Sequence, residues 1–391
     1  MKRFVIVAFL LVTIVTAVSA QQREKYEFMR NLPVYADSLI ADFDYPMAWG
    51  NSDIKNFKKW RKAARQKVFD CMLTPPPPAG DYDVKVLAEE QRDGYKARKI
   101  EIRLSRYYTV PALVLIPDGD GPFPAVNCLH DHGAHLYIGK EKMIRPIVTT
   151  DSSGMPKKED LDVLADADKW VADLYEGQYL GDYLAKNGFV VFSADAPMWG
   201  DRGQKEGPRR DRYDMIAGNM MMYGINLSAY MTYDDIAGTR FLATMPEVDP
   251  KRIGCAGCSM GAYRAWMLSA LSDDIKAGAS ICWMVTADEQ MSFKYKRTEN
   301  GGFANCFPGL RRWMDYPHVA SMACPKPMLF INGDSDKLFP IPGVKKAFDE
   351  MHRVWKSQGA DENLETEIWP VPHSCYKAAQ QRTLEFFKKH L

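Results

Sequence analysis

The sequence has no excess of charge of either sign and no second long apolar run after its N-terminus. Lys and Arg total 51 against 50 Asp and Glu, and no basic run occurs, which excludes binding of nucleic acid through a basic surface. Eight cysteines among 391 residues are too sparse for a small disulfide scaffold. The 24 prolines and 27 glycines are spread along the chain, which excludes collagen and coiled coil. A globular protein with 46% hydrophobic residues remains.

The N-terminal segment has the features of an export signal. Two basic residues precede the apolar run Phe4–Val18, and Ser19 and Ala20 complete a small-residue cleavage pattern. The run is short for a spanning helix, so residues 1–20 are predicted to be a secretory signal peptide. Gln21, rather than a cysteine, follows the cut, so no lipid anchor is indicated. We therefore expect a periplasmic or secreted protein without a membrane span.

The cysteines suggest no metal or redox centre. Cys255-x-x-Cys258 has the spacing of such a pair, but no second Cys or His pair stands near it in the sequence. Export permits disulfides, and Cys306 with Cys324 is the candidate pair.

Strand-length apolar runs alternate with helical patterns along most of the chain. Several later runs are continuously apolar, which is typical of strands buried on both faces of a parallel sheet. The alternation predicts an α/β fold with a mostly parallel central sheet of about eight strands and helices on both faces. The expected strands are 98–104, 110–116, 125–130, 190–194, 253–257, 277–282, 327–332 and 364–371.

The predicted domain organisation places this sheet after an extension. Residues 21–95 are expected to be partly helical, and residues 96–391 to form the α/β domain. Long connections at the carboxyl edge of a parallel sheet either wall a site or decorate the surface. The long insertions are 131–188, 195–232 and 284–326.

A nucleophile motif joins a predicted strand to a predicted helix. Gly257-x-Ser259-x-Gly261 follows an apolar run and precedes a helical pattern, as in the nucleophile elbow. The turn is so tight that the positions two before and two after the nucleophile require glycine. Ser259 is therefore the predicted nucleophile.

A serine nucleophile needs a base that is oriented by an acid, and in this fold the chain order is serine, acid, histidine. Asp336 follows the predicted strand 327–332 with room to turn back, and we favour it over Asp334, which is expected to hold the turn. His373 follows the last predicted strand and precedes the C-terminal helix. It is the predicted base.

The developing oxyanion needs two N–H donors. Met260, directly after the nucleophile, supplies one. The loop after the third predicted strand supplies the other, and we name His132 first and Ala134 second. His130, His132 and His135 could resemble a metal cluster, but a complete serine triad needs no metal, so no metal is predicted.

The chain resembles the α/β-hydrolase superfamily, in particular its exported dienelactone-hydrolase-like and acetyl-xylan-esterase-like branch. The resemblance implies a triad of Ser259, Asp336 and His373 with no metal or organic cofactor. It departs from the family at Ala262, where a glycine is usual, and in the His-Asp-His-Gly loop. The motifs that carry it are Leu129-His130, Gly139-Lys140-Glu141, Asp195-Ala196-Pro197, Gly200-Asp201-Arg202, Val248-Asp249-Pro250, Arg252-Ile253-Gly254, the elbow, Gly333 with Asp336, and Pro372-His373.

Together these features predict a secreted serine carboxylic-ester hydrolase. Relatives implied by the resemblance remove ester groups from plant polysaccharides, so the expected substrate is an acetyl or methyl ester of xylan or pectin. A serine peptidase of the same fold and a non-catalytic carbohydrate-binding relative are the alternatives. The sequence makes no prediction of oligomeric state.

Residues in the insertions are candidates for contacting such a substrate. Trp199, Trp283 and Trp313 could stack on sugar rings, because each lies near a predicted strand end or in an insertion. Arg209 and Arg312 could pair with uronate carboxylates. For each residue, ordinary packing or a solvated surface position is the alternative interpretation.

Overall fold

The computed structural model describes residues 28–29, 32–33, 35–204, 210–291 and 302–391. The predicted signal peptide and Arg209 lie outside these residues. None of the helices in the described part is long and apolar enough to cross a membrane.

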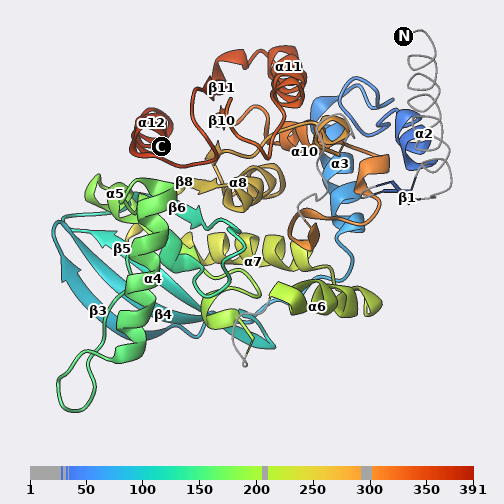
Figure 1. Cartoon of the computed structure of the whole chain (residues 1–391). Helices are drawn as coiled ribbons and strands as arrows, with labels where there is room; N and C mark the ends of the chain where they lie inside the picture. Colours follow the sequence, from blue (N-terminus) through green and yellow to red (C-terminus); the bar gives the residue numbers. More distant parts are fainter. Residues whose placement is uncertain (1–27, 30–31, 34, 205–209, 292–301) are drawn as a thin grey trace, which may run out of the picture.

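A nine-stranded, mostly parallel sheet forms the centre of the described chain (Figure 1). Its strands are β3 (Lys85–Arg92), β4 (Tyr95–Ser105), β5 (Tyr108–Pro117), β6 (Phe123–Leu129), β7 (Val190–Ala194), β8 (Val248–Cys258), β9 (Ala277–Ile281), β10 (Met328–Gly333) and β11 (Leu364–Trp369). They are ordered β11-β10-β9-β8-β6-β7-β5-β4-β3. The pairs β3–β4, β4–β5 and β5–β7 are antiparallel, and every other neighbouring pair is parallel.

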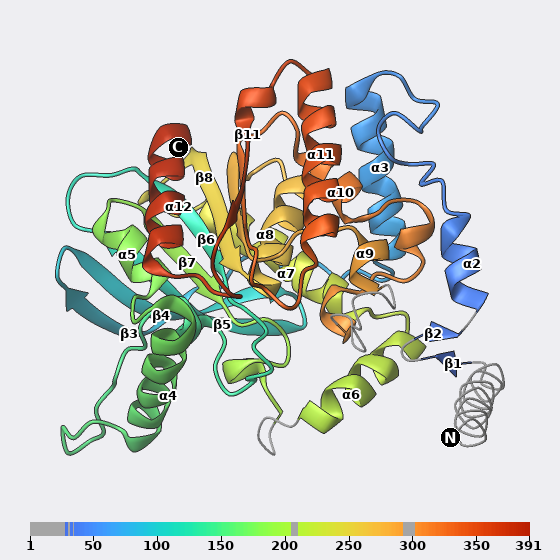
Figure 2. The same ribbon diagram turned by 45° about the horizontal axis from the view of Figure 1, so that its top comes forward.

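Two buried apolar clusters cover the two faces of the sheet, and helices contribute to both. Figures 1 and 2 show these helices as layers on either side. The first face carries α3 (Phe57–Cys71), α7 (Leu227–Leu242), α8 (Met260–Leu271), α10 (Tyr316–Ala320) and α11 (Ile341–Ser357). The second carries α4 (Lys158–Tyr175), α5 (Leu180–Lys186) and α12 (Lys377–His390).

The sequence patterns of two helices explain their positions. All twelve residues of α8 are buried, because the helix is apolar around most of its circumference and its one charged side chain, Arg264, pairs with Asp235 of α7. In α11 the buried residues recur every three or four positions, so one stripe faces the core. Smaller elements complete the described chain: β1 (Phe28–Met29), β2 (Leu32–Pro33), α2 (Tyr35–Ala41), α6 (Arg210–Met222) and α9 (Ala287–Met291).

The eight predicted strands are all present, but the predicted N-terminal boundary differs from the structure. Strand β3 and helix α3 lie within residues 21–95, yet β3 pairs with β4 and α3 packs into the main core. The sheet therefore has nine strands, and part of the predicted extension belongs to the same domain. The candidate disulfide is also wrong, because Cys306 and Cys324 are free thiols.

Candidate active site

Ser259 lies in a strained turn between β8 and α8. Its backbone has φ 56° and ψ −122°, an unusual conformation for a residue with a side chain. A Cβ on Gly257 would lie 2.4 Å from the carbonyl carbon of Gly261, and a Cβ on Gly261 would lie 1.9 Å from the oxygen of Leu129. The two glycines are thus required by close backbone packing, which is the reason the motif predicted.

The Ser259 turn is fixed to the neighbouring strand and opens into the helix. The Ser259 N–H donates to the Ile281 oxygen at 2.9 Å, and the Ser259 carbonyl accepts from the Tyr263 N–H. Met260 is the first residue of α8, so its N–H is one of the helix's initial donors without a partner inside the helix. The Ser259 side chain is therefore presented beside the positive end of a helix dipole.

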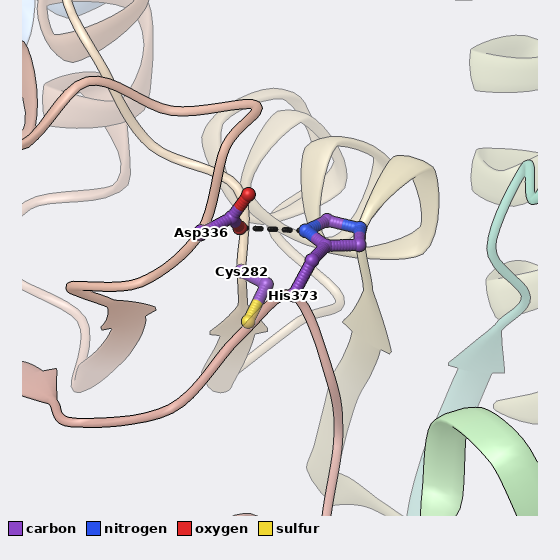
Figure 3. A group of neighbouring side chains, drawn as sticks. All are labelled: Cys282, Asp336 and His373. Atoms are coloured by element: carbon purple, nitrogen blue, oxygen red, sulfur yellow. Dashed lines mark hydrogen bonds and ion pairs between the residues drawn. The ribbon is translucent and has the colours of Figure 1, made fainter.

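His373 and Asp336 form a hydrogen-bonded pair (Figure 3). The two atoms, His373 Nδ1 and Asp336 Oδ2, are 2.6 Å apart, and the Asp336 carboxylate is fully buried. The other carboxylate oxygen accepts the Leu338 N–H at 2.8 Å. Burial lowers the pKa of His373, but the hydrogen bond and charge of Asp336 outweigh burial and hold that pKa above its ordinary value. Asp334, the alternative acid, is exposed and accepts a hydrogen bond from Ser335.

These residues reach one edge of the sheet because β8, β9, β10 and β11 run parallel. Ser259 follows β8, Asp336 follows β10 and His373 follows β11. Cys282, directly after β9, has φ 60° and donates its thiol hydrogen to the Ser374 oxygen at 3.1 Å. Its Sγ, an Asp336 oxygen and a His373 nitrogen lie within 4.8 Å of one another (Figure 3). Cys282 thus links the end of β9 to the His373 loop, a contact that sequence spacing did not indicate.

The loop after β6 contains the two candidates for the second oxyanion donor. The Ala134 N–H donates to His132 Nδ1 at 2.9 Å, so it is already engaged. His130 is fully buried, and its Nε2 accepts the Ala196 N–H at 3.0 Å. Burial, and then the charge of Arg264, hold the pKa of His130 well below its ordinary value, so this ring is neutral.

The three histidines of this region make different hydrogen bonds, although His130 and His132 both pack against Trp199. His135 Nε2 lies 2.5 Å from Asp166 Oδ2, and its ring stacks on Trp170 with the centroids 5.4 Å apart. The ring of His132 packs edge-on against Trp199, with the centroids 4.9 Å apart. Their contacts therefore support the loop at three different points.

Two fully buried lysines beside the loop were missed by the sequence analysis. Lys140 Nζ contacts Asp195 at 2.8 Å, Asp201 at 2.9 Å and Glu141 at 2.6 Å. These three carboxylates are a group whose geometry could hold a metal ion, and Lys140 supplies a cation to all of them. Lys142 contacts the loop itself. The Gly139-Lys140-Glu141 and Gly200-Asp201-Arg202 motifs contain Lys140 and two of the residues that it contacts. In the sequence they served only as evidence of the family resemblance.

The predicted aromatic contacts to substrate need correction. Trp199 is fully buried and donates its Nε1–H to the His132 oxygen at 3.2 Å, so it supports the loop and offers no ring face to a sugar. Trp283 is 5% exposed and packs among Tyr263, Trp266 and Tyr316.

Of the remaining residues predicted to contact substrate, two lie beside α3 and one lies outside the described residues. Trp313 is 37% exposed, and its ring is covered by the Lys67 ammonium of α3 at 4.1 Å. Arg312 is exposed on the 3₁₀ turn Leu310–Arg312, which packs against α3. Arg209 lies outside the described residues.

Tyr213 of α6 is a further residue beside the loop that the sequence analysis did not single out. It is 5% exposed, and its ring packs edge-on against His132 and Trp199, with centroids 5.7 and 5.8 Å away. Its hydroxyl is buried and has no hydrogen-bond partner among the described residues. A buried hydroxyl without a hydrogen-bond partner costs free energy of folding.

Comparisons with known proteins place this geometry in context. A family model described as the Abhydrolase family matches residues 38–376. YtaP of Bacillus subtilis (strain 168), a protein named as a hydrolase, is 27% identical over 300 residues, which are 76% of this chain and 89% of YtaP.

Two solved structures share the fold. One is of a Bacteroides fragilis NCTC 9343 protein named as an acetyl xylan esterase, with TM-score 0.65 and 20% identity over 88% of this chain and 84% of that chain. The other is a glucuronoyl esterase from Solibacter usitatus, with TM-score 0.61 and 13% identity over 86% of this chain and 93% of that chain.

Proposed function

This chain belongs to the Abhydrolase family, which confirms the predicted α/β-hydrolase fold, and we propose that it is a serine-dependent carboxylic ester hydrolase acting on carbohydrate. One observation carries the proposal. Ser259, in a positive-φ turn at the start of α8, emerges at the same sheet edge as the hydrogen-bonded pair Asp336–His373. Nucleophile, acid and base follow one another in the chain order of this fold.

In the proposed mechanism His373 takes the proton of the Ser259 hydroxyl as the hydroxyl oxygen attacks the ester carbonyl. Asp336 keeps the proton of His373 on Nδ1, so that Nε2 is the basic nitrogen, and its negative charge stabilises the imidazolium that forms. The Met260 N–H and an N–H of the loop after β6 stabilise the oxyanion. His373 then protonates the leaving alcohol, and water releases the acid from the acyl-enzyme by the same route.

The proposed substrate is an acetyl or methyl ester on a plant polysaccharide, xylan or pectin. The names of the structural relatives, an acetyl xylan esterase and a glucuronoyl esterase, support an ester carried on carbohydrate. We further propose that residues 1–20 direct export to the periplasm or the medium, where such polysaccharides are met.

The test is the Ser259→Ala variant with p-nitrophenyl acetate as the substrate. We expect kcat/KM to fall by at least about 10³-fold, with Ser335→Ala, an exposed serine, as the matched control. A fluorophosphonate probe should label the wild type and not Ser259→Ala. Near-normal hydrolysis by Ser259→Ala would refute the serine mechanism, and an absence of labelling of the wild type would favour a non-catalytic relative.

The substrate class is tested separately from the mechanism. Release of acetate from acetylated xylan and of methanol from methylated pectin can be compared with cleavage of a peptide anilide. We expect ester cleavage to dominate. Cleavage of the anilide at a comparable rate would instead favour the peptidase alternative.

A further inference from the structure

Lys142 binds the main chain of the loop after β6 from inside the protein. Its fully buried Nζ donates to the carbonyl oxygens of Asp131 and His132, at 3.2 Å each, and lies 3.3 Å from Asp131 Oδ1. The same carboxylate accepts the Tyr175 hydroxyl at 2.8 Å and the Trp170 Nε1–H at 3.2 Å. One ammonium and two side chains of α4 therefore hold this stretch of loop. The same two carbonyl oxygens also contact His130 Nδ1, 2.9 Å from the Asp131 oxygen, and Trp199 Nε1, which donates to the His132 oxygen.

The two carbonyl contacts determine where the loop's N–H groups point. The peptide groups that join Asp131 to His132 and His132 to Gly133 are trans. In a planar trans peptide the carbonyl and the following N–H point in opposite directions. Since both carbonyls are directed at Lys142, the N–H groups of His132 and Gly133 are directed away from it.

The side away from Lys142 is the side of α8. Tyr175, which contacts the same carboxylate, belongs to the cluster on the α4 face of the sheet, whereas α8 packs on the opposite face. The loop begins against the first turn of α8, because a Cβ on Gly261 would meet the carbonyl oxygens of Leu129 and His130. The stretch of loop that carries the His132 N–H therefore begins beside the end of the helix that follows Ser259.

Stability alone does not account for a charge at this position. Removing an ammonium from water is expensive, and burial lowers the pKa of Lys142 although Asp131 opposes this effect. Replacing buried ion pairs by apolar groups is often neutral or stabilising. What an apolar side chain cannot do is bind two successive carbonyl groups and so fix their peptide planes.

We propose that Lys142 is a positioning residue that orients the His132 N–H toward the oxyanion of an ester bound at Ser259. This inference rests on the proposed esterase function, and Lys142 itself touches no substrate. Lys142 acts through the loop, so loss of its ammonium should weaken stabilisation of the transition state and leave binding of the substrate in the ground state intact.

The test is Lys142→Met, which keeps the aliphatic stem and removes the ammonium. On p-nitrophenyl acetate we expect kcat to fall about 10²- to 10³-fold, as when one oxyanion donor is lost, with KM changed by less than about threefold. The matched control is Lys326→Met. Lys326 Nζ also donates to two main-chain carbonyls, those of Ser269 and Ser272, but at the far end of α8. This control should lose stability and retain kcat.

The outcomes separate the inference from the function on which it rests. If wild type shows no Ser259-dependent turnover, the proposed function fails and this inference fails with it. If wild type turns over and folded Lys142→Met has the same kcat, or only a raised KM, the inference alone fails. Should Lys142→Met not fold, the double variant Lys142→Met/Asp131→Asn leaves no unpaired buried carboxylate, and the same kcat criterion applies to it.

Discussion

Replacing Asp336 by Asn should inactivate the enzyme although a side chain of the same shape still fills the position. Asp336 Oδ1 accepts the Leu338 N–H, so the amide oxygen of an asparagine is held on that side. Its NH₂ group then faces His373 Nδ1, where Asp336 Oδ2 now lies at 2.6 Å. His373 must accept this hydrogen bond at Nδ1 and carry its own proton on Nε2. That tautomer cannot take a proton from Ser259.

The loss of the negative charge of Asp336 should lower the rate further, in addition to the effect of the tautomer. An imidazolium and a carboxylate with their charges about 4 Å apart interact by about 4 kcal/mol at an effective dielectric constant of about 20. Loss of this stabilisation in the transition state corresponds to about 10³-fold in rate. With the unfavourable tautomer added, we expect kcat for Asp336→Asn to be about 10³- to 10⁴-fold below wild type.

The assay is hydrolysis of p-nitrophenyl acetate, with folding checked by circular dichroism. The matched control is Asp334→Asn, since Asp334 lies two residues away, is exposed and accepts a hydrogen bond from Ser335. This control should keep wild-type kcat. A loss of less than tenfold in Asp336→Asn, or an equal loss in both variants, would refute the assignment of Asp336 as the acid.

Two further predictions concern ionisation and stability. Because Asp336 raises the pKa of His373, the acid limb of the pH profile of kcat/KM should have its midpoint above about pH 6.5. Activity should fall as the pH decreases through this midpoint, and a midpoint below about pH 6.5 would contradict the prediction. Tyr213→Phe removes an unsatisfied buried hydroxyl and should raise the free energy of unfolding in urea by about 1 kcal/mol, whereas Tyr179→Phe, whose hydroxyl donates to Asp168, should lower it by a similar amount. Equal changes in both variants would contradict the argument.

The nucleophile turn could be predicted because its cause is local. A strand, two glycines and a helix, all within residues 248–271, specify the geometry of Ser259 without reference to distant contacts. Asp336 and His373 could be placed because element order alone puts them at the same sheet edge. Strand β3 was not predicted, because its sequence is charged, its side chains are mostly exposed, and it lacks the apolar pattern from which the other strands were predicted.

The surroundings of the site could not be predicted because they depend on long-range burial. Tryptophan beside a strand end has the same sequence signal whether its ring faces solvent or is enclosed, and Trp199 is enclosed by residues far along the chain. Lysine is normally solvated, so nothing local indicates that Lys140 and Lys142 are buried. Their partners, Asp195 and Asp131, are 55 and 11 residues away.

Two of the three insertions, residues 131–188 and 195–232, supply contacts to the loop after β6. The first supplies Lys142 and the α4 side chains that hold Asp131, and the second supplies Ala196, which binds His130, and Trp199, which binds the carbonyl of His132. Each contact fixes a different part of the loop, and these atoms are outside the predicted triad. If the His132 N–H is the second oxyanion donor, as proposed, a substitution in either insertion should change kcat without touching the ester, because it changes the direction of that N–H group.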